Sequence, residues 1–191
     1  MAHVSIIGTG NMGQAIAAVA GRGGHAVQLL GQSDTDTAVA GDIVVLAVPY
    51  PAVGTVLAER GDSLAGKIVV DVTNPLNFET FDSLTVPSDS SATAEIAAAL
   101  PHSRVLKAFN TTFAATLAAG SVGSLTTTVL IAGEDADAKS TLAGVITSGG
   151  LNAIDAGGLS RARELEAVGF LQIGLAASEK IAWTGGFGVA A

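Results

Sequence analysis

A glycine-rich turn between a short apolar run and a helical pattern limits the possible folds of this chain more than any other feature. Gly8-Thr9-Gly10-Asn11-Met12-Gly13 follows the apolar residues 4–7 and precedes a helical stretch at residues 14–20. In G-x-G-x-x-G, the first glycine permits a tight turn, the second lets a pyrophosphate approach the backbone, and the third lets helix pack on strand. Free amides at the helix N-terminus favour an anion. The turn predicts a dinucleotide site, although glycines can also simply join a strand to a helix.

Short apolar runs alternate with helical patterns along most of the chain. We expect strands at residues 4–7, 25–30, 42–48, 67–72, 104–109, 127–132 and 152–155. We expect helices at residues 14–20, from the Pro49–Pro51 region to 59, at 135–147, and for about 20 residues from 160. The repeated β–α–β order with buried strands predicts an α/β fold, namely a doubly wound, mostly parallel (Rossmann) sheet with a C-terminal helical segment.

Two connections depart from this alternation. Residues 31–41 are too few for a crossover helix, so we expect a single helical turn or a loop there. Residues 73–93 form a long, turn-rich stretch, typical of a lid or binding loop.

The length of 191 residues suits one compact unit. We expect a nucleotide-binding domain at residues 1–158, with a helix and tail at 159–191 in the same unit. Apolar residues at positions 165, 168, 171 and 175 of the tail predict a helical stripe. Core packing, a dimer interface and a wall of an acceptor site remain open as its role.

Residues that follow the strands are the candidate ligand contacts, because ligands of open parallel sheets bind beyond the carboxyl ends of the strands. Small and apolar groups after the third strand would let a ribose or a flat ring lie close to the backbone, and polar side chains after the next two strands suit a carboxamide or ribose hydroxyls. Turn formation or helix capping are alternative roles for the asparagines. The candidates are Ala47, Val48, Pro49, Tyr50, Thr73, Asn74, Pro75 and Asn110. No catalytic residue is assigned.

The end of the second strand distinguishes the two nicotinamide cofactors. An acid there would hold the 2′-hydroxyl of NAD, whereas an arginine or a polar cluster admits the 2′-phosphate of NADP. Here Gly31, Gln32 and Ser33 follow the strand, with no acid at the tip and no arginine, and Asp34 comes next. Gln32 and Ser33 can donate to a phosphate, so this segment favours NADP over NAD.

Composition excludes several classes of function. Net charge is −8 with only nine Lys plus Arg, and no basic stripe is present for nucleic acid. Cysteine is absent and only three histidines occur without ligand spacing, so we expect no metal site. The longest uncharged stretch, residues 111–133, is rich in Thr, Ser and Gly, which argues against a membrane span. We expect a cytoplasmic protein that binds neither nucleic acid nor membrane.

Several segments, taken in order, resemble the coenzyme F420-dependent NADP oxidoreductase family. They are residues 8–13, 46–49, 70–76 and 107–111, and the ending from Arg163 to Phe187 is similar to small bacterial dinucleotide-binding members. The resemblance implies NADP(H) on the Gly8–Gly13 turn, with Pro49 and Asn74-Pro75 beside its ribose–nicotinamide half. It also implies a homodimer, and a deazaflavin (coenzyme F420) or flavin acceptor. Larger relatives carry a basic pair where this chain has Gly31-Gln32-Ser33.

Three functions remain open. The first is hydride transfer between NADP(H) and a deazaflavin or flavin-like small-molecule acceptor, which suits a chain with few acid–base groups. The second is reduction of a small carbonyl or imine, with Lys107 or Lys180 as the proton donor. The third is a non-catalytic module that senses NADP.

Overall fold

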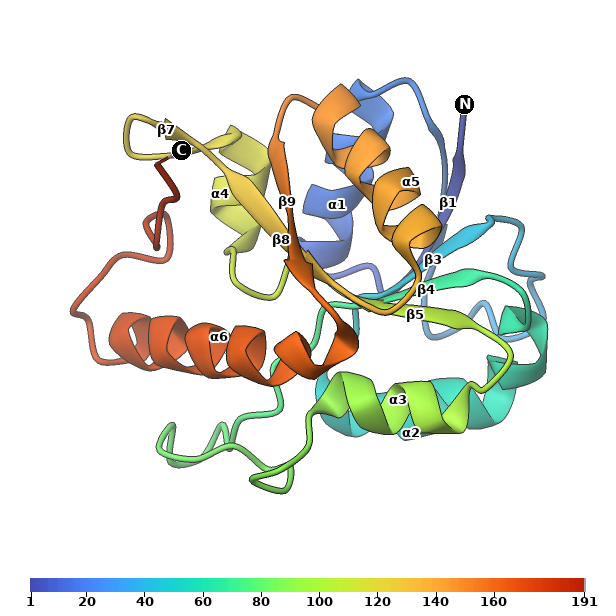
Figure 1. Ribbon diagram of the computed structural model, residues 1–191, viewed down its shortest axis with the longest axis horizontal. Coiled ribbons are helices and arrows are strands. Elements are labelled where there is room, and N and C mark those ends of the chain that lie inside the picture. The colour runs from blue at the N-terminus through green and yellow to red at the C-terminus, as the bar shows by residue number, and fades with distance from the viewer. Residues whose placement is uncertain (191) are drawn as a thin grey trace.

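A seven-stranded sheet forms the centre of the computed structural model, which describes residues 1–190 (Figure 1). Its strand order is β2-β1-β3-β4-β5-β8-β9. The bounds are β1 His3–Ile7, β2 Ala26–Leu30, β3 Ile43–Leu46, β4 Ile68–Asp71, β5 Arg104–Lys107, β8 Thr128–Ala132 and β9 Asn152–Gly157. Neighbouring strands run parallel except where β8 meets β5 in the antiparallel sense. The doubly wound, mostly parallel α/β sheet expected from the sequence is confirmed.

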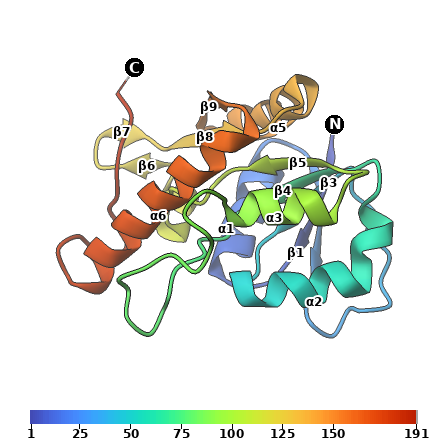
Figure 2. The ribbon, with the colours of Figure 1, turned by 60° about the horizontal axis from the view of Figure 1, so that its bottom comes forward.

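Helices cover both faces of the sheet (Figures 1 and 2). One face carries α1 (Asn11–Arg22), α4 (Ala114–Ala119) and α5 (Ala136–Ser148), and the other carries α2 (Tyr50–Arg60) and α3 (Ala92–Ala99). The sequence of strand β3 is apolar throughout because both faces of the strand are buried. Ile43 and Val45 pack in the cluster that includes α1 and α5, whereas Val44 and Leu46 pack in the cluster that includes α2 and α3.

The two connections that depart from the β–α alternation lie where the sequence predicts them, but the second is shorter than expected. Residues 31–41 contain turns and no helix. The long loop ends at Ser91, whose side chain accepts a hydrogen bond from the Ala94 amide (3.0 Å) and caps α3. Helix α3 is absent from the sequence-based assignment because its only large apolar residue is Ile96, so it carries no helical stripe. A small hairpin, β6 (Ser121–Val122) with β7 (Leu125–Thr126), was also not predicted.

The last helix, α6 (Ala162–Ala177), follows a single 3₁₀ turn at Leu159–Arg161 and lies beside the loop that precedes α3 (Figure 2). Core packing, one of the three roles left open for the apolar stripe, does not hold for the stripe as a whole, since Val168 is 36% and Leu171 is 55% exposed. The buried face instead includes Glu166 and Gln172. Helix α6 packs against the carboxyl ends of β4 and β5, where polar groups supply partners for these side chains.

None of the helices in residues 1–190 is long and apolar enough to cross a membrane. The cytoplasmic location and the division at residue 158 stay predictions.

Candidate functional site

The three glycines of the turn after β1 occupy different surroundings. The Gly8 amide donates to the Leu30 carbonyl (2.8 Å), and its φ of +120° is one that only glycine adopts readily. A Cβ on Gly8 would lie 2.2 Å from the Ala47 carbonyl oxygen, and one on Gly13 would lie 2.1 Å from the Gly8 carbonyl oxygen. A Cβ on Gly10 would meet nothing within 4 Å. The first and third glycines therefore permit close backbone packing, while the second faces open space.

Helix α1 starts directly after this turn without a side-chain cap. Gly10 is its N-cap, and no acidic residue lies in its first turn. The first amides of a helix have no partner within the helix and carry a partial positive charge. The N-terminus of α1 thus presents donors to the space beside Gly10, as a pyrophosphate requires, and the residues here fit that group.

A cavity of about 410 Å³ opens on one side of the turn, between the segment after β2 and helix α2. Eight of the predicted contact residues line it: Gly8, Thr9, Gly10, Gly31, Gln32, Ala47, Val48 and Pro49. The remaining lining residues are not among the predicted contact residues, and they are Ile7, Leu30, Thr35, Ala52, Thr55, Val56, Glu59 and Arg60. The size is in the range of small-molecule sites. We call it the first cavity.

A second cavity, of about 400 Å³, lies on the other side of the turn. Four predicted residues line it: Asn11, Met12, Asn74 and Asn110. The remaining lining residues are not among the predicted contact residues, and they are Phe78, Thr112, Phe113, Ala114, Ala115, Ile173 and Trp183. Within the described part of the chain, no ionisable side chain lines this cavity. The rings of Phe113 and Trp183 lie 5.0 Å apart at its wall.

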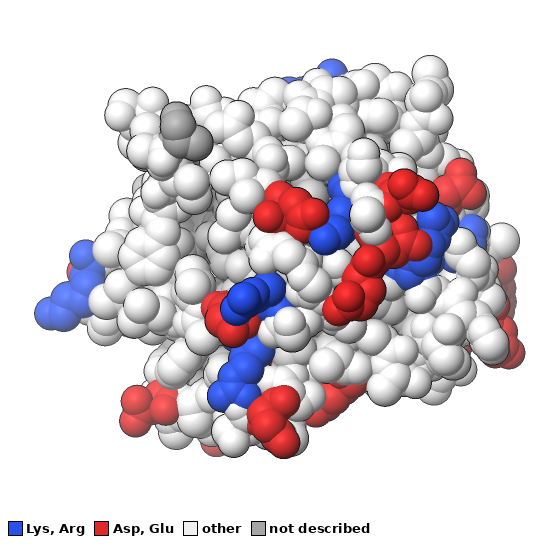
Figure 3. Space-filling view, in the orientation of Figure 1, with Lys and Arg blue, Asp and Glu red and all other residues white. Residues whose placement is uncertain are grey.

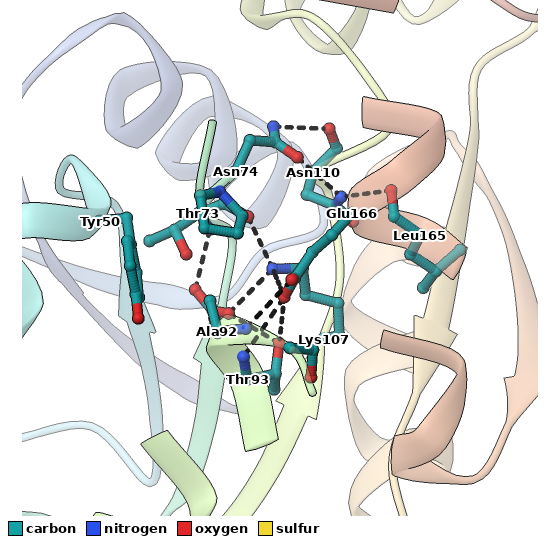
Figure 4. A network of polar contacts seen from close by, with 12 residues as sticks. Tyr50, Thr73, Asn74, Ala92, Thr93, Lys107, Asn110, Leu165 and Glu166 are labelled. Atoms are coloured by element: carbon teal, nitrogen blue, oxygen red, sulfur yellow. Dashed lines mark hydrogen bonds and ion pairs between the residues drawn. The ribbon is translucent and has the colours of Figure 1, made fainter. Parts of the chain in front are cut away.

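The two asparagines of the second cavity hold each other and helix α6. The Asn74 side-chain amide donates to the Asn110 carbonyl (3.0 Å), and the Asn110 amide donates to Asn74 Oδ1 (3.0 Å) and to the Leu165 carbonyl (2.8 Å) (Figure 4). A Cβ on Gly169 would lie 2.2 Å from Asn74 Oδ1, so this glycine lets α6 approach the pair. Asn110 is 3% exposed, and its Oδ1 has no hydrogen-bond partner. A buried acceptor without a donor suits a ligand amide.

Five of the predicted contact residues border neither cavity: Gly13, Ser33, Tyr50, Thr73 and Pro75. Tyr50 lines a separate surface cavity between α2 and α3, where its hydroxyl donates to Glu95. Burial and then this hydrogen bond raise the pKa of the Tyr50 hydroxyl well above its usual value, so the group stays protonated. Thr73 is buried, and its carbonyl oxygen accepts from Lys107.

A fully buried ionic cluster lies beneath the asparagine pair (Figure 4). Lys107 Nζ donates to Asp71 (2.9 Å), to Glu166 (3.0 Å) and to the Thr73 carbonyl (2.6 Å). All three of its N–H groups are thereby used. Two carboxylates face one ammonium, and the Ala92 amide (3.0 Å) and the Thr93 amide (3.3 Å) at the start of α3 donate to Glu166. The cluster therefore fixes α6 to β4, β5 and α3.

Neither of the two lysines that the sequence suggested as proton donors borders a cavity of the site. Lys107 is 0% exposed and lines neither cavity. Lys180 is exposed after the end of α6 and also lines neither cavity. The sequence indicates part of this cluster, because Asp71 and Lys107 each end an apolar strand. In the structure these two residues are paired neighbours in β4 and β5. Glu166 gives no such signal, because its position depends on how α6 packs.

The sheet, the glycine turn and the two cavities at its carboxyl edge have the arrangement of a Rossmann-type, dinucleotide-binding fold. The sequence profile described as NADP oxidoreductase coenzyme F420-dependent matches residues 26–75. An F420-dependent NADP reductase of Methanocaldococcus jannaschii is 31% identical over 166 residues, which is 85% of this chain and 74% of that protein. The chain belongs to the coenzyme F420-dependent NADP oxidoreductase family, and it is an NADP-dependent oxidoreductase.

Solved structures agree with this assignment. A candidate F420-dependent NADP reductase from Arthrobacter sp. FB24 superposes with a TM-score of 0.84 at 25% identity, covering 98% of this chain and 99% of that one. An imine reductase from Bacillus cereus gives a TM-score of 0.65 at 15% identity, covering 95% of this chain and 63% of that one. At this identity, the similarity to the imine reductase shows a shared fold alone.

Proposed function

We propose that this protein transfers a hydride between NADP(H) and a deazaflavin or flavin-like acceptor that occupies the second cavity. One observation carries the proposal, namely that the described residues lining that cavity include no ionisable side chain. A planar ring system that accepts a hydride directly needs orientation and exclusion of water more than a protein acid. The M. jannaschii relative, which is named an F420-dependent NADP reductase, supports the same class of acceptor.

The residues of the two cavities divide the cofactor between them in this proposal. The amides at the start of α1 hold the pyrophosphate, and the first cavity takes the adenosine half. The unpartnered Oδ1 of Asn110 accepts a hydrogen bond from the nicotinamide carboxamide. Phe113 and Trp183 supply flat apolar surface for the acceptor ring. When bound, NADPH supplies the hydride, and the protein holds the two rings together away from water.

Reduction of a small imine or carbonyl is the second candidate, favoured only by the fold shared with imine reductases. It requires a proton donor next to the substrate. The bonds of Lys107 and the exposure of Lys180 argue against either lysine in that role.

We further propose that the protein is a homodimer. Figure 3 shows the face of the molecule that carries α6. Few charged side chains lie there over the C-terminal half of α6 and the tail. Large apolar side chains of this region are exposed, among them Leu171 at 55%, Trp183 at 52% and Phe187 at 44%. Exposed apolar side chains in a region with few charges are typical of an interface with a second subunit.

A panel of acceptors with NADPH tests the proposed function. Oxidised coenzyme F420, FMN, FAD and a cyclic imine are each mixed with enzyme and NADPH, and the loss of nicotinamide absorbance is followed. We expect turnover with the deazaflavin or a flavin and at most slow turnover with the imine. Turnover with the imine alone would favour the second candidate. NADPH binding without turnover on any acceptor would favour the non-catalytic sensor.

A further inference from the structure

The segment that follows β2 supplies no basic residue to the adenosine end of the first cavity. The segment after β2, residues 31–41, contains no lysine or arginine, and it carries Asp34 and Asp36. Asp34 folds inward, because its carboxylate accepts from the Gly31 amide (2.7 Å). A 2′-phosphate at this point therefore has no cation from its own segment to neutralise it.

Helix α2 brings a cation to the same place from a distant part of the sequence. Arg60 is the last residue of α2 and lines the first cavity, together with Glu59. Its guanidinium donates to the Thr37 carbonyl (2.8 Å) and to the Asp34 carbonyl, so it is attached to the segment after β2. The residue is only 8% exposed. It is the one basic residue among those of the described chain that line this cavity.

We propose that Arg60 recognises the adenosine 2′-phosphate and so provides the NADP specificity of this chain. The inference rests on the proposed binding of NADP(H) in the first cavity. A guanidinium has five N–H groups in a planar fork, of which two are bonded to the carbonyls of Asp34 and Thr37. The other groups are available to a phosphate, and a partly desolvated Arg–phosphate contact is a strong hydrogen bond.

Three acidic residues of α2 and of the segment after β2 limit this specificity. Glu59 lines the same cavity, and the Asp34 carboxylate lies on the Gly31 amide at its edge. Asp36 is exposed in the same segment. These charges repel a phosphate, so the preference for a 2′-phosphate is moderate. Removing one of them strengthens the preference, whereas removing the arginine abolishes it.

Binding of two nucleotide fragments tests this role without any acceptor or turnover. Calorimetry compares 2′,5′-ADP with 5′-AMP, which differ only by the 2′-phosphate. The wild-type protein should bind 2′,5′-ADP about 10-fold more tightly, close to the lower end of what hydrogen bonds to a charged group contribute. Arg60→Gln should bring the ratio of the two dissociation constants close to one. Asp34→Asn and Glu59→Gln should each raise the ratio, and Arg104→Gln, an exposed arginine bonded to the Gly66 carbonyl, should leave it unchanged.

The ratio of the two dissociation constants distinguishes recognition of the 2′-phosphate by Arg60 from a purely structural role of this residue. If Arg60→Gln weakens both fragments equally, the arginine only holds the segment after β2 and the proposal is wrong. If Arg60→Gln does not fold, the carboxylate variants still decide, since a constant ratio in both of them would also overturn it. Wild-type protein that binds NADPH but does not distinguish the fragments contradicts the role of Arg60 alone. Protein that binds neither NADPH nor the fragments contradicts the proposed function itself.

Discussion

The glycines of the turn after β1 give a matched pair of substitutions at the scale of single residues. Gly10 has a φ of −71° and open space at its Cβ position, so Gly10→Ala should change the free energy of unfolding by less than about 0.5 kcal/mol. The new methyl group would occupy the space of the pyrophosphate, and the Kd for NADPH should rise at least ~10-fold, or about 1.4 kcal/mol. Calorimetry and thermal unfolding of the same samples measure both effects.

Gly13→Ala serves as the contrasting control. Its Cβ would lie 2.1 Å from the Gly8 carbonyl, so it should lower stability by about 1–3 kcal/mol, as overpacking does. Equal unfolding temperatures for the two variants would contradict the assigned roles. The residue types and spacing of the turn predict these roles. They cannot predict Arg60, because its place at the first cavity depends on where α2 ends relative to the segment after β2.

At the scale of elements, the buried cluster joins α6 to the sheet. Lys107→Met would leave the carboxylates of Asp71 and Glu166 buried without their cation. We expect a loss of about 3–5 kcal/mol in the free energy of unfolding, measured by urea denaturation. Lys139→Met is the control, since Lys139 pairs with the exposed Asp155, and it should cost about 1 kcal/mol or less. Similar losses for both variants would mean that the cluster does not hold α6 in place.

The pair of Asp155 and Lys139 also gives a dependence on pH. The hydrogen bond from Lys139, and then the one from the Gly157 amide, lower the pKa of the Asp155 carboxyl in the folded protein. Its contribution is therefore present above the unfolded-state pKa and is lost as pH falls through the folded-state pKa. Asp155→Asn should be slightly less stable than wild type at neutral pH, with the difference vanishing in acid. A difference that grows as the pH falls would contradict this sign.

A strand or helix could be predicted where its apolar residues follow a regular pattern along the chain. The apolar run of β3 predicts a strand buried on both faces, and the structure confirms it. The face of α6 was not predictable, because Glu166 and Gln172 are buried by partners from distant segments rather than by apolar character. The same limit applies to α3, where an alanine-rich sequence begins a helix by virtue of the Ser91 cap.

At the scale of the whole molecule, several exposed large apolar side chains lie on α6 and the tail, among them Leu171, Trp183 and Phe187. If this surface joins two copies, Leu171→Glu should convert a dimer into a monomer, because a buried carboxylate without a partner is costly. Light scattering after size-exclusion chromatography measures the mass directly. Glu164→Gln, an exposed change in the first turn of the same helix, should keep the dimer. A wild-type protein that is monomeric at all concentrations tested would exclude the proposed assembly.

Hydride transfer between the nicotinamide and an acceptor ring, both held at the second cavity, is the proposal for the whole molecule. Single-turnover mixing of enzyme, oxidised coenzyme F420 and NADPH deuterated at the transferable position tests it most directly, with mass spectrometry of the product. We predict that one deuterium appears in the reduced deazaflavin and that Gly10→Ala suppresses its transfer. Oxidation of NADPH with no deuterium in the deazaflavin, or no reaction at all although NADPH binds, would contradict this account.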